Sequence, residues 1–281
     1  MTEQIADKED KDKKKKLFSL PRLLKAGVHF GHHPRRWNPK MKKYIYDVRN
    51  DAHVINLDKT IVLLQEAMQA ISNIISLGGS VLLVGTRKET AKFVSEAAKA
   101  TAQYYIDHHW LGGTITNWET VSNSIIRLQR LDKKLSDPLF IKSITKKEML
   151  SMQRQRDKLE RDLGGIRDMG GIPDMVFILD TNREYLAIKE AKCMDIPIIA
   201  ILDTNSDPDG IAYPIPGNDD SIKSIEYYCN LYIEAAFRGL EEQMNSMTID
   251  YDRADNNENL SDDLIESNEN QDNKVKSNKS D

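Results

Sequence analysis

The sequence is poor in the features that mark secreted, membrane-spanning or disulfide-stabilised proteins. No apolar run approaches the roughly 18–20 residues that a membrane-spanning helix needs, and residues 1–16 contain acidic side chains but no apolar signal region. The chain has 2 cysteines, Cys193 and Cys229, each within an apolar helical pattern, so we expect buried thiols in a reducing compartment. Together these absences predict a cytoplasmic protein.

Motifs of common enzyme classes are also absent. Neither the phosphate-binding pattern GxxxxGKS/T nor the dinucleotide pattern GxGxxG occurs, and no serine lies in a nucleophile-elbow motif. A nucleotide-binding or sugar-phosphate-binding enzyme would therefore have to rely on other groups. The candidates for this enzyme hypothesis are Arg87, Lys88, Asp180 and Asp203.

The net charge of −4 conceals a strong segregation of charge. Residues 241–281 hold 12 Asp and Glu against 4 Lys and Arg, whereas residues 1–240 hold 32 against 36. The stretch 13–60 is the most basic, with 13 Lys and Arg and 3 Asp and Glu. A block this basic attracts polyanions such as nucleic acids, because their binding releases condensed counterions. A solvated charged face is the alternative, but it would not require the aromatic residues and prolines interleaved here.

Strand and helix patterns alternate along most of the chain. Strands are expected at 53–57, 81–84, 104–106, 175–179, 197–202 and 213–215, and helices at 59–77, 88–101, 182–194 and 221–238. The strand expected at 81–84 is continuously apolar, as in strands that are buried on both faces of a sheet. Repeated strand–helix units predict an α/β fold whose doubly wound, mostly parallel sheet is covered by helices on both faces.

The alternation breaks between about 115 and 163. Two long, sparsely apolar helices joined by a loop fit this region, and the second begins with a capping box at Thr145 and Glu148. We expect a helical hairpin that projects from the sheet domain. The chain is thus divided into a disordered charged extension (1–18), an α/β domain with the inserted hairpin (19–240) and a disordered acidic tail (241–281).

The strongest candidate for nucleic-acid binding lies in an irregular segment between residues 35 and 44. Five cations are interleaved with aromatic residues there: Arg35, Arg36, Lys40, Lys42 and Lys43. Cations neutralise phosphates, and Trp37 and Tyr44 could stack on unpaired bases, with Asn38 beside them. The alternative is that the rings pack on the protein and only the cations face RNA, which we favour for Trp37.

Arg87 and Lys88 follow a buried strand through a glycine turn and open a helix. Ligands of doubly wound sheets collect at the carboxyl ends of strands, and helix N–H groups beside two cations suit a phosphate. A tight turn with ordinary surface cations explains the same residues equally well. We include both among the candidate RNA contacts.

Trp110 and Asn117 belong to a second segment rich in aromatic residues and glycine, at the root of the predicted hairpin. Glycine permits close approach of the backbone to a ligand, so both residues join the candidate RNA contacts. A tight turn that seats the hairpin is at least as good an explanation.

Two groups of residues could suggest a metal site. Residues 203–209 contain three aspartates after a strand, and Asp180 could complete an acidic pocket, but Asp, Asn, Ser and Pro also form turns, which we favour. The other group consists of His29, His32, His33 and His53, with His108 and His109 further along the chain. No cysteine lies near these histidines, and structural zinc sites usually include thiolates. We therefore expect no metal and no cofactor.

A series of short motifs resembles the family of the second small-subunit ribosomal protein, in its bacterial and organellar form. The motifs run in order over about residues 19–240: Gly27-Val28-His29-Phe30-Gly31-His32, Trp37-Asn38-Pro39-Lys40-Met41, Val84-Gly85-Thr86-Arg87, Trp110-Leu111-Gly112-Gly113, Thr116-Asn117-Trp118, Gly164-Gly165-Ile166, Asp168-Met169-Gly170-Gly171-Ile172-Pro173-Asp174, Asp203-Thr204-Asn205-Ser206-Asp207-Pro208 and Ile215-Pro216-Gly217-Asn218-Asp219-Asp220. Any one motif is weak, but so many in one order are specific.

The resemblance implies a flavodoxin-like domain with an inserted helical coiled-coil hairpin. It also implies a non-catalytic protein of the small ribosomal subunit that contacts its rRNA. Its further implied partners are neighbouring small-subunit proteins, including the large mRNA-binding one. The charged extension and the acidic tail have no counterpart in these motifs.

Overall fold

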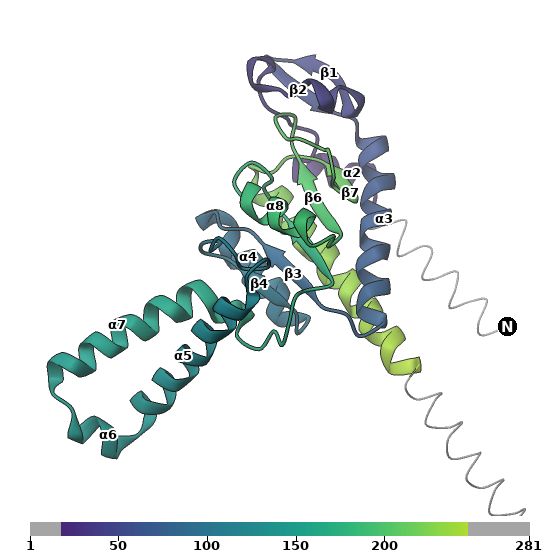
Figure 1. Cartoon of the computed structure of the whole chain (residues 1–281). Coiled ribbons are helices and arrows are strands. Elements are labelled where there is room, and N and C mark those ends of the chain that lie inside the picture. Colours follow the sequence, from purple (N-terminus) through teal and green to yellow (C-terminus); the bar gives the residue numbers. More distant parts are fainter. Residues whose placement is uncertain (1–17, 247–281) are drawn as a thin grey trace, which may run out of the picture.

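The computed structural model describes residues 18–246 and contains one five-stranded sheet at its centre (Figure 1). The strands are β3 (Val81–Val84), β4 (Tyr104–Ile106), β5 (Met175–Ile178), β6 (Ile198–Leu202) and β7 (Tyr213–Pro216). They lie in the order β4-β3-β5-β6-β7, and all neighbours pair in parallel. In chain order this is 2-1-3-4-5, the order of flavodoxin-like doubly wound sheets, so the predicted fold class is confirmed.

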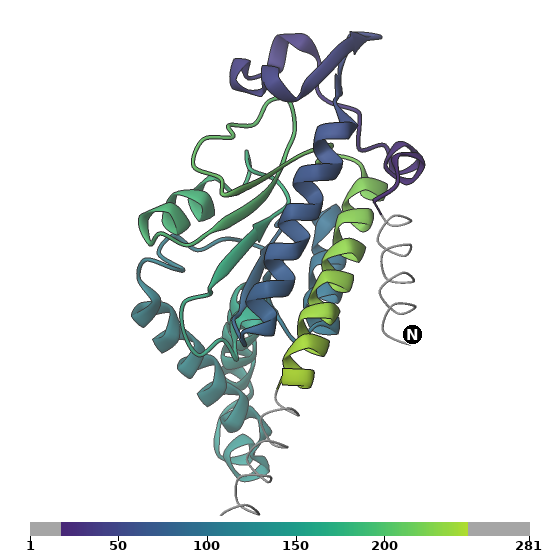
Figure 2. The same cartoon turned by 90° about the vertical axis from the view of Figure 1, so that its right-hand side faces the viewer.

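Alternate residues of the strands point into two separate apolar layers. On one face, Leu83 and Phe177 pack with α3 (Leu57–Ser76), α4 (Lys88–Ala100) and the helix over 222–246. Figure 2 shows α3 and the last helix side by side on this face. On the other face, Leu82 and Val176 pack with α8 (Tyr185–Cys193) and with the root of the hairpin. Burial on both faces explains why β3, β5 and β6 are continuously apolar.

The helical hairpin projects from the sheet domain (Figure 1). It consists of α5 (Trp118–Ser136), α6 (Pro138–Ser143) and α7 (Lys146–Leu163), and α5 contacts α7. The predicted capping box of Thr145 and Glu148 begins α7. Few of its residues are buried beyond the root, so the hairpin is held to the body at one end; a coiled-coil geometry stays a prediction.

The N-terminal region contains more regular structure than the sequence analysis predicted. After α2 (Leu20–Ala26) come two 3-10 turns, η1 (Pro34–Arg36) and η2 (Pro39–Tyr44), and then a hairpin of β1 (Ile45–Arg49) and β2 (Ala52–Ile55). The strand expected at 53–57 therefore pairs antiparallel with β1 and is no part of the main sheet. Asn50 and Asp51 both have positive φ, and these residue types tolerate that conformation in a two-residue hairpin turn.

Three local expectations are corrected by the structure. Phe18, assigned to the disordered extension, is buried in the core, and the last helix continues to residue 246, past the boundary expected at 240. Cys229 is buried as expected, but Cys193 is exposed because it lies on the outer side of α8. The rest of the extension and tail, 1–17 and 247–281, lies outside the described residues. None of the helices in 18–246 has the length and apolar composition of a bilayer-spanning segment.

Gly165→Ala should destabilise the protein, because a Cβ there would lie 2.1 Å from the backbone oxygen of Tyr105. Relieving this overlap means shifting the 3-10 turn η3 (Gly164–Ile166), which follows α7, against β4, and overpacking of this kind costs about 1–3 kcal/mol. Urea unfolding of the two proteins measures the loss. Gly170→Ala is the matched control, because its Cβ would meet nothing within 4 Å. Equal stability of the two variants would contradict the close contact at the hairpin root.

Candidate nucleic-acid interface

The N-terminal segment 28–44 lies across the loops that follow β6 and β7. The backbone N–H of Asn38 donates to the carbonyl oxygen of Thr204 at 2.7 Å, and the N–H of Asn218 donates to that of Val28 at 3.0 Å. Gly31 passes so close that a Cβ would lie 2.5 Å from Thr204 Cγ2. These contacts fix the segment over the carboxyl ends of the sheet, where ligands of such folds collect.

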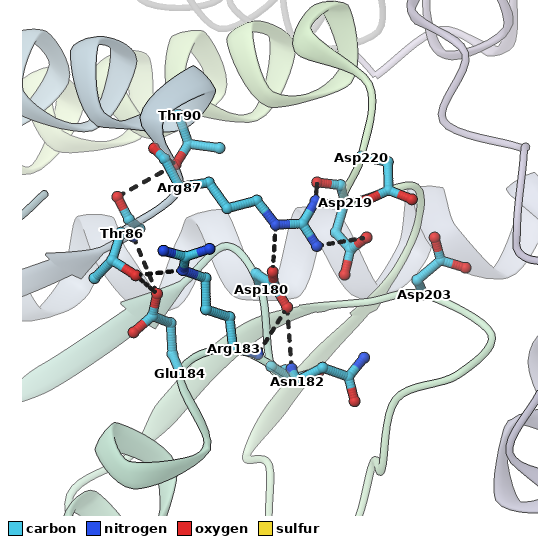
Figure 3. Close-up of polar contacts among 12 residues, drawn as sticks. Thr86, Arg87, Thr90, Asp180, Asn182, Arg183, Glu184, Asp203, Asp219 and Asp220 are labelled. Carbon is cyan, nitrogen blue, oxygen red and sulfur yellow. Dashed lines mark hydrogen bonds and ion pairs between the residues drawn. The ribbon is translucent and has the colours of Figure 1, made fainter. Parts of the chain in front are cut away.

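Arg87 is the centre of an ion network at this end of the sheet (Figure 3). Its Nε lies 2.5 Å from Asp180 Oδ2, its Nη1 contacts the carboxylate of Asp220, and its Nη2 lies 3.9 Å from Asp219 Oδ1. Asp180 also accepts hydrogen bonds from the backbone N–H groups of Asn182 and Arg183. Arg87 therefore connects the loops after β3, β5 and β7.

His32 joins the N-terminal segment to the same network. Its Nδ1 lies 3.0 Å from Asp203 Oδ2 and its Nε2 lies 3.3 Å from Asp220 Oδ2. The hydrogen bond to Asp203 is the main reason that the pKa of His32 is raised. The two carboxylate oxygens of Asp219, by contrast, accept no hydrogen bond within the described residues. Burial, together with the charges of Asp203 and Asp180, raises its pKa to about 8.

This acidic cluster differs from both metal sites weighed in the sequence. His32, Asp203, Asp219 and Asp220 each offer a ligand atom, and all these atoms lie within 4.8 Å of one another. One imidazole and three carboxylates could hold a divalent cation. Of the histidines considered for zinc, His32 is the one that belongs to this set.

The carboxylates around Arg87 argue against the enzyme hypothesis. Arg87, offered as part of a phosphate cradle, is surrounded by three carboxylates, and Lys88 is exposed at the start of α4. Asp180 and Asp203 carry negative charge into the same place, which disfavours binding of a phosphate there. The structure thus favours a structural role for Arg87 over a direct contact with RNA phosphate.

The cations between 35 and 43 divide into two kinds. Lys40 Nζ lies 2.8 Å from Asp207 Oδ2 and 2.5 Å from Asp209 Oδ2, so its charge is balanced within the chain. The other four are exposed and have no carboxylate within 4.0 Å among residues 18–246: Arg35, Arg36, Lys42 and Lys43. Arg35 and Arg36, with His32 and His33, line a cavity of about 360 Å³.

The two aromatic residues of this segment pack on the protein, as the alternative interpretation held. The Trp37 ring lies 5.3 Å from that of His53, and Tyr44 is buried against the second face of the sheet. Asn38 accepts a hydrogen bond from the N–H of Lys40 and so caps η2. These groups shape the segment that carries the cations.

At the hairpin root, Trp110 is buried whereas Asn117 is exposed. The Trp110 indole is 3 % exposed and donates from Nε1 to Glu190, so it cannot stack on a base, and its candidacy as an RNA contact is corrected. The turn interpretation therefore holds for Trp110. Asn117 is exposed at the start of α5, and its side-chain oxygen accepts from the hydroxyl of Thr120.

Sequence reasoning missed Asp219 and Asp220 as site residues. They directly follow β7, so the rule that functional groups lie after parallel strands would have found them. Residues 213–215 were expected to form a strand, and no site residue was expected after it. In the sheet β7 lies at the edge, but Asp220 in its following loop contacts Arg87 in the loop after β3.

Replacing Arg87 should lower the free energy of unfolding. Arg87→Met leaves Asp180 and Asp219 buried without their cation, and removal of one partner of a buried ion pair costs about 3–5 kcal/mol. Urea unfolding measures the change, with Lys88→Met as the control that removes a neighbouring exposed charge. The network would not be needed for stability if both variants unfolded at the wild-type urea concentration.

Asp219→Asn should reduce a pH dependence of stability. The pKa of the Asp219 carboxyl is about 8 in the folded protein, whereas that of an unfolded aspartate is about 4. The stability that protonated Asp219 contributes is thus complete below about pH 4 and lost as the pH rises through about 8. Between about pH 5 and 8 the wild type should lose on the order of 1 kcal/mol per pH unit more than the variant. Urea unfolding with a chelator present tests this, and parallel losses would contradict the raised pKa.

Comparison with known proteins supports the resemblance. The family model described as Ribosomal protein S2 matches residues 23–239. The chain is 52 % identical over 233 residues to the small ribosomal subunit protein uS2 of Chelativorans sp. (strain BNC1), covering 83 % of this chain and 86 % of that protein. It is 50 % identical over 238 residues to that of Rhodospirillum centenum, covering 85 % and 91 %. A ribosomal-protein family also agrees with the expectation of no enzymatic activity. The chain belongs to the ribosomal protein S2 family.

Proposed function

We propose that this chain is a structural component of the small ribosomal subunit and that Arg35, Arg36, Lys42 and Lys43 contact phosphates of its rRNA. The observation that carries this proposal is the absence of carboxylate partners for these four cations within the described residues. A cation that is already paired gains less from a phosphate, because it must first give up its partner. The four unpaired cations can release condensed counterions on binding and so drive association.

The fixed backbone of the segment supports the same proposal. Residues 28–44 are tied to the loops after β6 and β7, and Met41 and Tyr44 are buried in the core. The cations are therefore held in place before RNA binds, which lowers the entropy that binding must overcome. Within this surface, the cavity beside Arg35 and Arg36 is the place where one phosphate group fits best, because guanidinium groups match its geometry.

The proposal extends to Lys88, Asn117 and neighbouring proteins. Lys88 and Asn117 are exposed and remain candidate RNA contacts. Membership of the family supports association with other proteins of the small subunit, and we include the large mRNA-binding protein among them, as the motifs imply. A ribosome-bound position in the cytoplasm is part of the same proposal.

Neutralising the four unpaired cations should weaken RNA binding and lower its dependence on salt. A variant with Arg35→Gln, Arg36→Gln, Lys42→Gln and Lys43→Gln should reduce the slope of log K against log salt by about 3, since each phosphate contact contributes roughly 0.7–0.9. Binding to small-subunit rRNA is measured over a series of salt concentrations. The control neutralises four exposed lysines of α4, α8 and the last helix: Lys92, Lys99, Lys189 and Lys223. Equal slopes for the two variants would contradict the proposed contacts.

Within the same segment, Lys40→Gln should weaken RNA binding less than Arg36→Gln. The charge of Lys40 is balanced by Asp207 and Asp209, whereas Arg36 has no such partner in the described chain. Sucrose-gradient sedimentation of each variant with 30S particles gives a second measurement. Full incorporation of the fourfold variant at physiological salt would overturn the assignment of this surface to rRNA.

A further inference from the structure

Glu190 of α8 is a buried carboxylate that accepts five hydrogen bonds from a single loop. Its Oε1 accepts from Trp110 Nε1 at 3.0 Å and from the backbone N–H of Gly113 at 2.8 Å. Its Oε2 accepts from the N–H groups of Ile115 and Thr116, at 3.0 and 3.3 Å, and from the Thr116 hydroxyl at 3.3 Å. Loop 110–116 therefore wraps around this one side chain.

The carboxylate is charged, although no cation compensates it. Among residues 18–246, no Lys, Arg or His forms an ion pair with Glu190. Burial by itself would raise its pKa, but the hydrogen bonds from Trp110, Ile115, Gly113 and Thr116 outweigh burial, and the pKa is lowered. Converging N–H groups that balance an anion in this way form an anion-binding nest. The chain fills this nest with its own side chain.

The position of this nest gives it a mechanical consequence. Loop 110–116 lies between β4 and α5, so it is the connection through which the body leads into the hairpin, whereas Glu190 lies on α8 in the body. Beyond the root, α5 and α7 contact each other, and few side chains of the hairpin are buried. The direction of α5 therefore depends on how firmly this loop is held.

We propose that Glu190 is a positioning residue, whose carboxylate occupies the nest of loop 110–116 and fixes the direction in which the helical hairpin leaves the domain. The relevance of a fixed hairpin rests on the proposed ribosomal function, because a rigid hairpin meets its neighbours in the subunit at lower entropic cost. The anchoring itself is a property of the free chain. It is therefore tested without ribosomes.

Amide hydrogen exchange and chemical rescue test the nest. In Glu190→Gln, exchange at Gly113, Ile115 and Thr116 should quicken at least tenfold, while amides of β3 and β5 keep their wild-type rates. In Glu190→Ala, which leaves space at the carboxylate position, added formate should slow exchange at the three amides again, and chloride at equal ionic strength should not. Glu226→Gln, which removes an exposed carboxylate from the last helix, is the control.

Wild-type exchange rates in Glu190→Gln would overturn the proposal, and so would equal effects of formate and chloride on Glu190→Ala. The Gln variant keeps the size of the side chain, so the first measurement stands even where the Ala variant fails to fold. Failure of RNA binding by the cationic segment would leave these results unchanged. The two proposals can thus fail separately.

A distance measurement tests the direction of the hairpin. Spin labels at Ser143→Cys in the hairpin and Asn73→Cys on α3 are introduced with Cys193→Ser, since Cys193 is exposed and Cys229 is buried. The distribution of distances between the labels should broaden in Glu190→Gln and stay narrow in Glu226→Gln. Distributions of equal width in the wild type and Glu190→Gln would show that the root packing alone fixes the hairpin and would overturn the proposal.

Discussion

The ion network around Arg87 is the interaction on which the arrangement of loops at the carboxyl end of the sheet depends. A parallel sheet brings the loops after its strands to one edge, and here those loops carry Asp180, Asp203, Asp219 and Asp220. Four carboxylates in one place repel one another strongly where water is partly excluded. The guanidinium of Arg87 connects three of them, and the imidazole of His32 connects two. The loops can therefore lie close together and support the N-terminal segment above them.

The cations of the chain fall into two groups, according to whether they form ion pairs within the chain. Arg87 and Lys40 lie against aspartates, so their charges are balanced within the chain. Arg35 and Arg36 extend from the same segment with their charges unpaired in the described part of the chain, so a polyanion can bind there at little cost. A basic stretch of sequence thus contains cations with carboxylate partners and cations without them in the described part of the chain, and only the tertiary structure tells them apart.

Two buried carboxylates in this fold show how hydrogen-bond donors decide ionisation. Glu190 is 9 % exposed and stays charged, because five N–H and O–H groups converge on it. Asp219 is 1 % exposed, accepts no such bond in residues 18–246 and lies beside other carboxylates, so its pKa rises instead. The first accepts hydrogen bonds from one loop, whereas the second makes the stability of the cluster depend on pH.

The sequence by itself determined the fold class, the strands β3 and β4, the capping box of α7 and, through ordered motifs, the family. These features depend on local patterns of apolar residues, turns and caps, which a short window contains. Tertiary structure decided which charges meet: Lys40 and Asp207 are 167 positions apart, and Trp110 and Glu190 are 80 apart. It also turned the expected strand at 53–57 into half of a separate hairpin. Contacts between residues this distant depend on the packing of the whole chain, because no local pattern specifies which side chains the folded sheet will bring together.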